Sequence, residues 1–402
     1  MKQSVKKFLF IPLFILVSSC DFTIPYINDY YNSSPAKTTS SSLISSTTSS
    51  TQSNSFNSSS NTPSISSPSS GEKEFDDVSV HFLELGNQYS GDSVYIKAGD
   101  TDILIDAGSR KNSAPTIANY INTYCTDGIL EYVIATHAHQ DHIAGFVGES
   151  ENGTRNGIFY QYQCETIIDF AQADSTSQIY KDYLTARNRQ VENGAKHYTS
   201  LECYNNANGA QRSYTIGKNV TLNILYQKYY EQKSSSGEND YSVCVLISQG
   251  NDNHFLFTGD LESSGEKSLV ESNNLPHVKL FKGGHHGSGT SNTDTLLDCI
   301  HPENICICTC AGTSEYTSNK LNMFPYQETV NRMAKHTENI YVTSQVDKEA
   351  SSSTAKDFTT KPMNGNIRVT STVSSFTINC SNNNLKLKDT EWFKNNRTWP
   401  SK

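Results

Sequence analysis

Short apolar runs that end in polar or turn-forming residues recur along the chain from about Val78 onward. They include Ile103 to Asp106, Tyr132 to Ala135, Val243 to Ile247 and Phe255 to Phe257. Runs of this length are typical of buried strands, and helical or turn-rich stretches separate them. The alternation predicts an α/β fold in which helices pack on buried sheets.

The same pattern continues in the C-terminal part of the chain. A helix is predicted over 325–333, because proline is favoured in the first turn of a helix. Closing strands are predicted over 339–343 and 365–370. We interpret Trp392 and Trp399 as packing residues at the edge of the domain.

The N-terminal residues have a different pattern. Three lysines precede an apolar run from Phe8 to Leu16, which is too short to span a bilayer, and small residues lead from there to Cys20. This pattern is typical of a bacterial lipoprotein signal peptide over residues 1–19, with Cys20 as the lipidated residue. A plain secretory leader is the alternative. We expect the protein at the bacterial cell surface, anchored by lipid to the outer face of the cytoplasmic membrane.

Residues 20–73 are dominated by Ser, Thr and Asn, with too few apolar side chains to offset the entropy of ordering. We predict a disordered linker here, and a glycosylated or adhesive stalk is the alternative. Residues 74–402 remain, about 330 residues, which is enough for one large domain.

The charge balance limits the class of partner. The chain carries 32 Lys and Arg against 41 Asp and Glu, a formal net charge of -9. A basic stripe with interleaved aromatic residues is absent from the sequence. Tight binding of a long nucleic acid is therefore not expected.

The cysteines do not form an evident disulfide framework. With Cys20 assigned to lipid, nine of the 10 cysteines remain, an odd number. Cys306, Cys308 and Cys310 follow an apolar strand pattern and are interpreted as small buried side chains. A thiolate metal site is the alternative for these three residues.

A cluster of metal-binding residue types follows the apolar run that ends at Ala135. His137 and His139 project to one side of an extended segment, and Asp141 and His142 follow on the turning chain. Nitrogen and oxygen donors in such a cluster suit Zn, Mn or Fe.

Two later segments add donors. The apolar strand pattern of 254–258 leads to Gly259 and Asp260, which places a carboxylate where a strand ends. A second strand pattern opens into the glycine-rich segment 282–288, which contains Lys282, paired histidines and Ser288. Asp260 is a candidate bridge between two metals.

These segments, in this order, resemble the metallo-β-lactamase superfamily, and in particular the hydrolase domain of the competence DNA-uptake channel family, here as a free-standing lipoprotein. The resemblance runs from about Val78 to about Pro400 and rests on segments 80–86, 103–108, 136–142, 238–243, 258–260 and 284–288. It implies a four-layer αβ/βα sandwich, with the metals at one edge where loops of both sheets meet.

The resemblance also implies roles for the donors. His137 and His139 correspond to ligands of a first metal, Asp141 and His142 to ligands of a second, and Asp260 to the bridge. One of the two histidines His285 and His286 would complete the second site and the other would face the substrate, with the order left open. Asp141, Asp260 and His286 are the residues expected to carry catalysis.

Asp106 resembles a buried aspartate that holds the metal-binding loop by hydrogen bonds. Many members of the superfamily have one more histidine ligand before the bridging Asp, and the candidates in this chain are His197 and His254. His254 begins a strand and is poorly placed, and we interpret His197 as a packed or solvated side chain. The first metal is therefore expected to be bound less tightly than the second.

Two divalent cations, Zn or alternatively Mn, would activate a water as the nucleophile of a hydrolysis. Lys282, the glycine amides and Ser288 form a donor-rich edge that favours a phosphate group. We therefore expect a phosphodiesterase or nuclease acting on small or short phosphodiesters, with single-stranded nucleic acid as a further candidate. The alternatives are a phosphocholine esterase or lactonase acting on wall or signal molecules, and a non-catalytic surface-binding lipoprotein with a structural metal.

Overall fold

The computed structural model describes residues 75–348 and 359–401. The predicted signal peptide, Cys20 and the predicted linker lie outside the described residues. Within the described part of the chain, no helix is long and apolar enough to cross a membrane.

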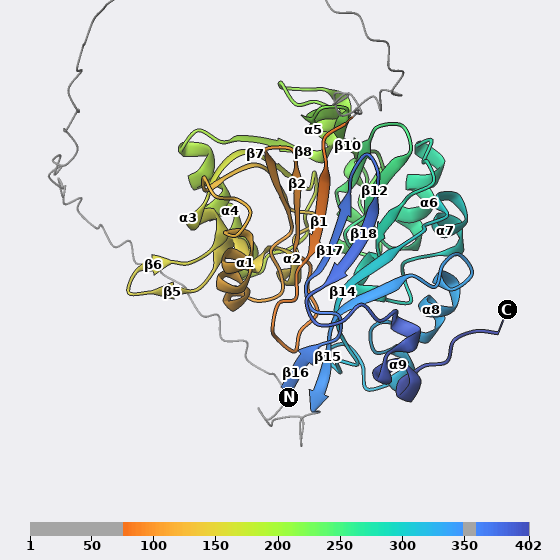
Figure 1. Ribbon diagram of the computed structural model, residues 1–402. Coiled ribbons are helices and arrows are strands. Elements are labelled where there is room, and N and C mark those ends of the chain that lie inside the picture. The colour runs from red at the N-terminus through yellow and green to blue at the C-terminus, as the bar shows by residue number, and fades with distance from the viewer. Residues whose placement is uncertain (1–74, 349–358, 402) are drawn as a thin grey trace, which may run out of the picture. The chain divides into compact units, whose positions relative to one another are not determined.

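Two eight-stranded sheets form the centre of the fold (Figure 1). The first sheet has the order β18-β17-β1-β2-β3-β4-β7-β8 and the second the order β16-β15-β14-β13-β12-β11-β10-β9. The strands of the first sheet are β1 Val78–Phe82, β2 Val94–Ala98, β3 Thr101–Ile105, β4 Ile129–Ile134, β7 Gln163–Asp169, β8 Lys196–Thr199, β17 Ile367–Ser371 and β18 Phe376–Cys380. Those of the second are β9 Ser213–Gly217, β10 Val220–Leu225, β11 Cys244–Gln249, β12 Asn253–Phe257, β13 Leu280–Lys282, β14 Ile305–Ala311, β15 Ile340–Lys348 and β16 Thr359–Pro362.

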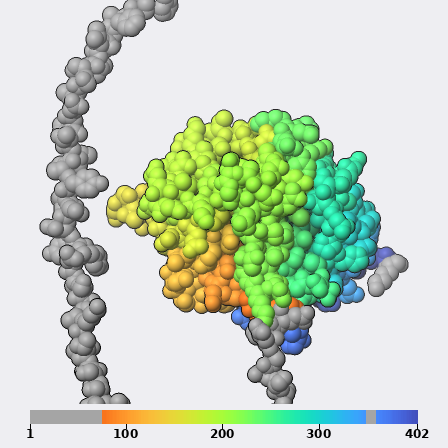
Figure 2. Space-filling view, turned by 90° about the horizontal axis from the view of Figure 1, so that it is seen from above, coloured from red at the N-terminus to blue at the C-terminus, as the bar shows by residue number. Residues whose placement is uncertain are grey.

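Helices cover the outer face of each sheet (Figure 1). The helices are α1 Ala114–Ile121, α2 Gln140–Val147, α3 Ile158–Gln161, α4 Gln178–Glu192, α5 Ser200–Asn205, α6 Ser263–Ser272, α7 Asp294–Ile300, α8 Gln327–Met333 and α9 Glu391–Asn396. A short hairpin of β5 Ser150–Glu151 and β6 Thr154–Arg155 projects from the body and is visible in yellow in Figure 2.

The apolar core has two parts. One cluster includes residues of both sheets, such as Phe82 and Phe257, whose ring centroids are 6.5 Å apart, and it extends to residues of α1 to α4. The other lies between the second sheet and helices α6 to α9, and contains Trp392 with Trp399 packed against it. The predicted four-layer αβ/βα arrangement and the packing role of both tryptophans are confirmed.

The predicted strands correspond to β3, β4, β11, β12, β15 and β17, with boundaries shifted by a few residues. Strand β14 is buried throughout, and Cys306, Cys308 and Cys310 are free thiols within it, as expected for small apolar side chains. The predicted helix over 325–333 begins later, at Gln327, because residues 324–326 form the turn that precedes α8.

Parallel pairing determines where the polar segments meet. β3 and β4 are parallel neighbours in the first sheet, as β12 and β13 are in the second. The carboxyl ends of parallel strands lie at the same edge of a sheet, so loops that follow them are neighbours. Asp106 follows β3, His137 follows β4, Asp260 follows β12 and the paired histidines follow β13.

A buried carboxylate fixes the loop that follows the paired histidines. Glu266 of α6 accepts hydrogen bonds from the backbone amide of Asn292 at 2.6 Å and from the amide and hydroxyl of Thr293 at 2.8 and 2.6 Å. The Asn292 side chain in turn bonds both backbone groups of Gly284. Glu266 thus connects α6 to the histidine loop.

We predict that Glu266 makes stability pH-dependent, because burial raises the pKa of its carboxyl group to about 7. A raised folded-state pKa contributes stability below the unfolded value near 4.5, and this contribution is lost as pH rises through 7. From pH 4.5 to pH 8, the unfolding free energy of the wild type should fall by about 3 kcal/mol relative to that of Glu266→Gln. Urea denaturation at several pH values measures it. Glu271→Gln, exposed on the same helix, is the matched control, and a difference independent of pH would contradict the prediction.

Candidate metal centre

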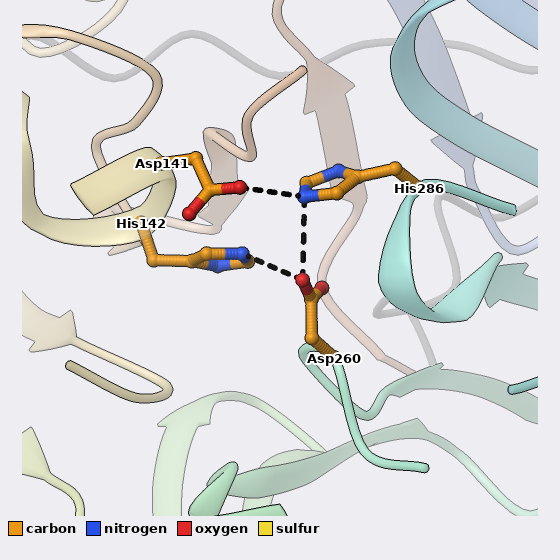
Figure 3. A group of neighbouring side chains, drawn as sticks. All are labelled: Asp141, His142, Asp260 and His286. Carbon is orange, nitrogen blue, oxygen red and sulfur yellow. Dashed lines mark hydrogen bonds and ion pairs between the residues drawn. The ribbon is translucent and has the colours of Figure 1, made fainter. Parts of the chain in front are cut away.

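Four buried donors converge at one edge of the sandwich. Atoms of Asp141, His142, Asp260 and His286 all lie within 4.8 Å of one another (Figure 3). Asp141 and His142 are in the first turn of α2, Asp260 follows β12, and His286 lies in the short 3₁₀ turn η4 Gly284–Gly287 after β13. The predicted donors from three segments therefore meet in space.

Asp260 stands between the two imidazoles of this cluster. Its Oδ2 lies 3.1 Å from Nε2 of His142 and 3.2 Å from Nε2 of His286. His286 Nε2 is also 3.3 Å from Oδ2 of Asp141. Nε2 of His142 and Oδ1 of Asp260 are buried and have no hydrogen-bond partner within the described part of the chain. Buried donors of this kind fit a divalent cation, whose ligands need no other partner.

His137 and His139 lie beside the cluster. Nε2 of His137 is 3.0 Å from Nδ1 of His139, and the rings of His137 and His142 have centroids 4.1 Å apart. His137 is buried, whereas His139 is exposed and forms the N-cap of α2. The pair presents two nitrogens to one point, as ligands of one metal would. Its assignment to a first metal stays a prediction.

The paired histidines have different surroundings. His286 is buried inside the cluster, while the His285 side chain is 17 % exposed, with its Nε2 3.9 Å from Asp260 Oδ2. Both residues have positive φ, at 47° and 53°, which is uncommon outside glycine and turns the two side chains in different directions. His286 therefore lies inside the cluster of donors, whereas His285 lies at its partly exposed edge.

A carboxylate and a backbone carbonyl behind the two imidazoles orient them. Nδ1 of His142 donates to Oδ2 of Asp106 at 2.7 Å, and Asp106 also accepts from the amide and hydroxyl of Thr136, both at 2.7 Å. Nδ1 of His286 donates to the carbonyl of Cys308 at 2.9 Å. Because Nδ1 is the donor in each case, Nε2 is the nitrogen of each imidazole that is left to bind a metal. The hydrogen bonds expected of Asp106 are present.

Asp92 is a site residue that the sequence analysis missed. It is buried in the loop between β1 and β2, forms an ion pair with Lys282, and has its Oδ1 3.2 Å from Nδ1 of His286. The preceding Gly91 packs against Ser109 so closely that a Cβ there would lie 2.3 Å from the serine Cβ. The available sequence signal was the Gly-Asp pair itself. Gly91 and Asp92 come shortly before β2, just as Gly259 and Asp260 follow β12.

Lys282 and Ser288 do not line the cleft that leads to the cluster. Nζ of Lys282 is buried, lies 3.7 Å from Oδ1 of Asp260 and donates to the carbonyl of Gly259 at 3.2 Å. The Ser288 hydroxyl is buried and lies 3.1 Å from that of Thr290. Lys282 therefore acts on the ligand carboxylates, and the donor-rich edge expected for a phosphate group lacks both side chains.

The protonation of the cluster follows from its crowded charges. Burial alone would raise the pKa of Asp260, but the neighbouring imidazoles of His142 and His286 hold it well below the usual value. Burial would lower the pKa of each of these imidazoles, yet Asp260 and the other carboxylates raise it well above the usual value. The site therefore attracts positive charge strongly, and divalent cations can supply that charge in place of protons.

A cleft of about 430 Å³ leads to the cluster. It is lined by Arg110, His139, Gln140, Asp141, Asn239, Asp260, His285, Glu315 and Tyr316. Arg110 pairs with Glu315 at 2.6 Å, and the Tyr316 hydroxyl donates to Oδ2 of Asp141 at 2.9 Å. The sequence analysis did not identify Arg110 or Tyr316, because each is brought to the site by a loop with no motif of its own.

The two further histidines lie apart from the cluster. His197 is on the edge strand β8 and its Nε2 is 2.8 Å from Asp169 Oδ1, which fits the packed side chain expected. His254, at the start of β12, lies 3.1 Å from the Ser248 hydroxyl.

Two comparisons of the sequence found similar proteins. The family model described as anti-Pycsar protein Apyc1 matches residues 84–282. Recombination protein 2 of Haemophilus influenzae is 28% identical over 109 residues, which cover 27% of this chain and 13% of that relative's length.

Similar solved structures have low sequence identity. The metallo-β-lactamase fold protein YhfI from Bacillus subtilis is 13% identical with a TM-score of 0.34, over 66% of this chain and 96% of that one. A diphosphatase from the PhnP family is 11% identical with a TM-score of 0.35, over 66% and 94% of the two chains. The facing sheets, their outer helices and the His and Asp segments at one edge show that this chain has the metallo-β-lactamase fold.

Proposed function

We propose that the chain is a metal-dependent hydrolase that cleaves small or short phosphodiesters. The observation that carries this proposal is the position of the cluster at the end of a cleft, which Asp141, Asp260 and His285 line. A structural metal site is usually closed by protein ligands, whereas a catalytic site keeps a position open for water and substrate. Access from a cleft therefore favours catalysis over the surface-binding alternative.

The donor set fits two divalent cations, with zinc as the first candidate and manganese as the second. His137 and His139 would hold one cation, Asp141, His142 and His286 the other, and Asp260 both. Bound cations of this kind supply a water that ionises near neutral pH and an electrophile for the substrate oxygen. The protein residues orient the ligands, through Asp106 on His142 and the Cys308 carbonyl on His286.

A phosphodiester is proposed because two cleft residues, His285 and Arg110, can donate to an anion that cations at Asp141 and Asp260 would hold. His285 can donate from its Nε2, and burial lowers the pKa of this imidazole to about 4, which makes it a neutral donor. The Arg110 guanidinium stands at the rim, although Glu315 neutralises much of its charge. This limited positive charge, with a net chain charge of -9, supports small or short substrates over long nucleic acid.

We also propose that the protein is held at the outer face of the bacterial cytoplasmic membrane through a lipid on Cys20. The support is the basic and apolar leader with small residues before Cys20. Membrane fractionation of cells that express the wild type or Cys20→Ala tests the location. Equal membrane association of the two proteins would contradict it.

The reaction should require both metal and Asp260. Removal of metal with a chelator should abolish turnover of bis-p-nitrophenyl phosphate, and zinc or manganese should restore it. Asp260→Asn should lower kcat by about a thousandfold or more, because the bridging carboxylate holds the groups that stabilise the transition state. Single-stranded DNA and a carboxylic ester are assayed in parallel. Turnover of the ester alone would replace the phosphodiester proposal, and absence of bound metal would overturn the enzyme proposal.

Variants of the paired histidines should separate ligation from substrate contact. His286→Gln should lose bound metal, with an affinity lower by about 10- to 100-fold or more, because a buried donor is removed. His285→Gln should keep its metal and lose activity through kcat or KM, by about 10- to 100-fold. Metal content by mass spectrometry and steady-state kinetics measure the two effects. The reverse pattern would assign the histidines the other way.

A further inference from the structure

An exposed aromatic side chain stands beside the candidate metal ligands. Tyr316 is 52 % exposed and lines the cleft together with His139 and His285. Large apolar side chains this exposed are few among the described residues. The other cleft residues are polar or charged, so Tyr316 provides the apolar surface of the cleft.

Two contacts fix the position of the Tyr316 ring. At one end the hydroxyl donates to Asp141 Oδ2 at 2.9 Å. On its side the ring packs against Phe324, with centroids 5.2 Å apart. Phe324 in turn lies 5.7 Å from the His286 ring and 5.9 Å from the His285 ring. The ring is therefore held next to the cluster before any ligand binds.

The segment that carries Tyr316 is anchored on both sides. Glu315 pairs with Arg110 and accepts the backbone amide of Ser90 at 3.0 Å. The Gly312 amide donates to the carbonyl of Phe324 at 2.9 Å, which closes the loop. A loop anchored in this way loses little entropy when a ligand packs against its exposed ring.

The segment is also held by a buried arginine. The Arg397 guanidinium donates to the carbonyl of Met323 at 2.7 Å and to that of Pro325 at 3.0 Å. Burial lowers the pKa of Arg397 to about 10. These two bonds fix the backbone on either side of Phe324, and so the ring that supports Tyr316.

We propose that Tyr316 forms a subsite for a planar ring attached to the phosphate that the metals bind. The inference rests on the proposed phosphodiesterase function and assigns Tyr316 as the residue of that cleft that selects diesters carrying a planar ring. Stacking on a fixed aromatic side chain stabilises a planar ring, whereas a diester of small alkyl groups gains nothing from it. A cleft of about 430 Å³ has room for one such group beside a phosphate.

Competition with two phosphate monoesters tests the subsite in the full chain. Phenyl phosphate and methyl phosphate share the phosphate and differ in the ring, and each is measured as an inhibitor of bis-p-nitrophenyl phosphate hydrolysis. Phenyl phosphate should inhibit the wild type about tenfold more tightly, equivalent to about 1.4 kcal/mol. In Tyr316→Ala this ratio should fall to about one.

Three further variants distinguish stacking from other roles of Tyr316. Tyr316→Phe keeps the ring and removes the hydroxyl bond to Asp141, so it should keep the tenfold ratio. Tyr316→Leu keeps apolar bulk without a planar face and should lose most of the ratio. Leu321→Ala is the matched control, because Leu321 is 55 % exposed on the same segment and does not line the cleft. Thermal denaturation and metal content verify that each variant is folded and loaded.

The outcomes separate this subsite from the proposed function. If the wild type and Tyr316→Ala both hydrolyse the diester and show the same ratio of inhibition constants, the subsite is overturned and the phosphodiesterase function stands. A ratio lost as fully in Tyr316→Phe as in Tyr316→Ala assigns the effect to the hydroxyl and also overturns it. A wild type that does not hydrolyse the diester overturns the proposed function and, with it, the subsite that rests on it.

Discussion

The structure depends on the crowding of buried carboxylates around two imidazoles. Asp92, Asp106, Asp141 and Asp260 all lie within ion-pair distance of His142 or His286. Carboxylates out of water are costly unless cations compensate them, and Lys282 supplies only part of that charge. Divalent cations bound at these donors would balance the remainder.

This constraint explains why two sheets are needed. His142 is held from the first sheet by Asp106, after β3, and faces Asp260, which follows β12 of the second sheet. Neither sheet alone presents a complete donor set. The core between the sheets, with Phe82 against Phe257, therefore fixes the distance between ligands as well as the stability of the fold.

The sequence was most informative where a short segment contains its own chemistry. The 136–142 segment and the strand ends before Asp260 and His285 predicted the cluster, and the apolar runs predicted the layers. The sequence could not separate His285 from His286, because a turn with two positive φ angles determines their directions. The Gly-Asp pair at Asp92 was a sequence signal that the analysis did not use. The sequence could not reveal Tyr316, which reaches the site through packing of distant loops, or that Lys282 is turned toward Asp92.

The central claim is that the buried charge of this cluster is balanced by two metals bridged by Asp260. A crystal structure of the zinc-loaded protein, with anomalous data collected on both sides of the zinc edge, tests it most directly. The account predicts two anomalous peaks, one near His137 and His139 and one near His142 and His286, with Asp260 contacting both. A cluster without any peak, with Asp260 still within ion-pair distance of both imidazoles as in Figure 3, would contradict it.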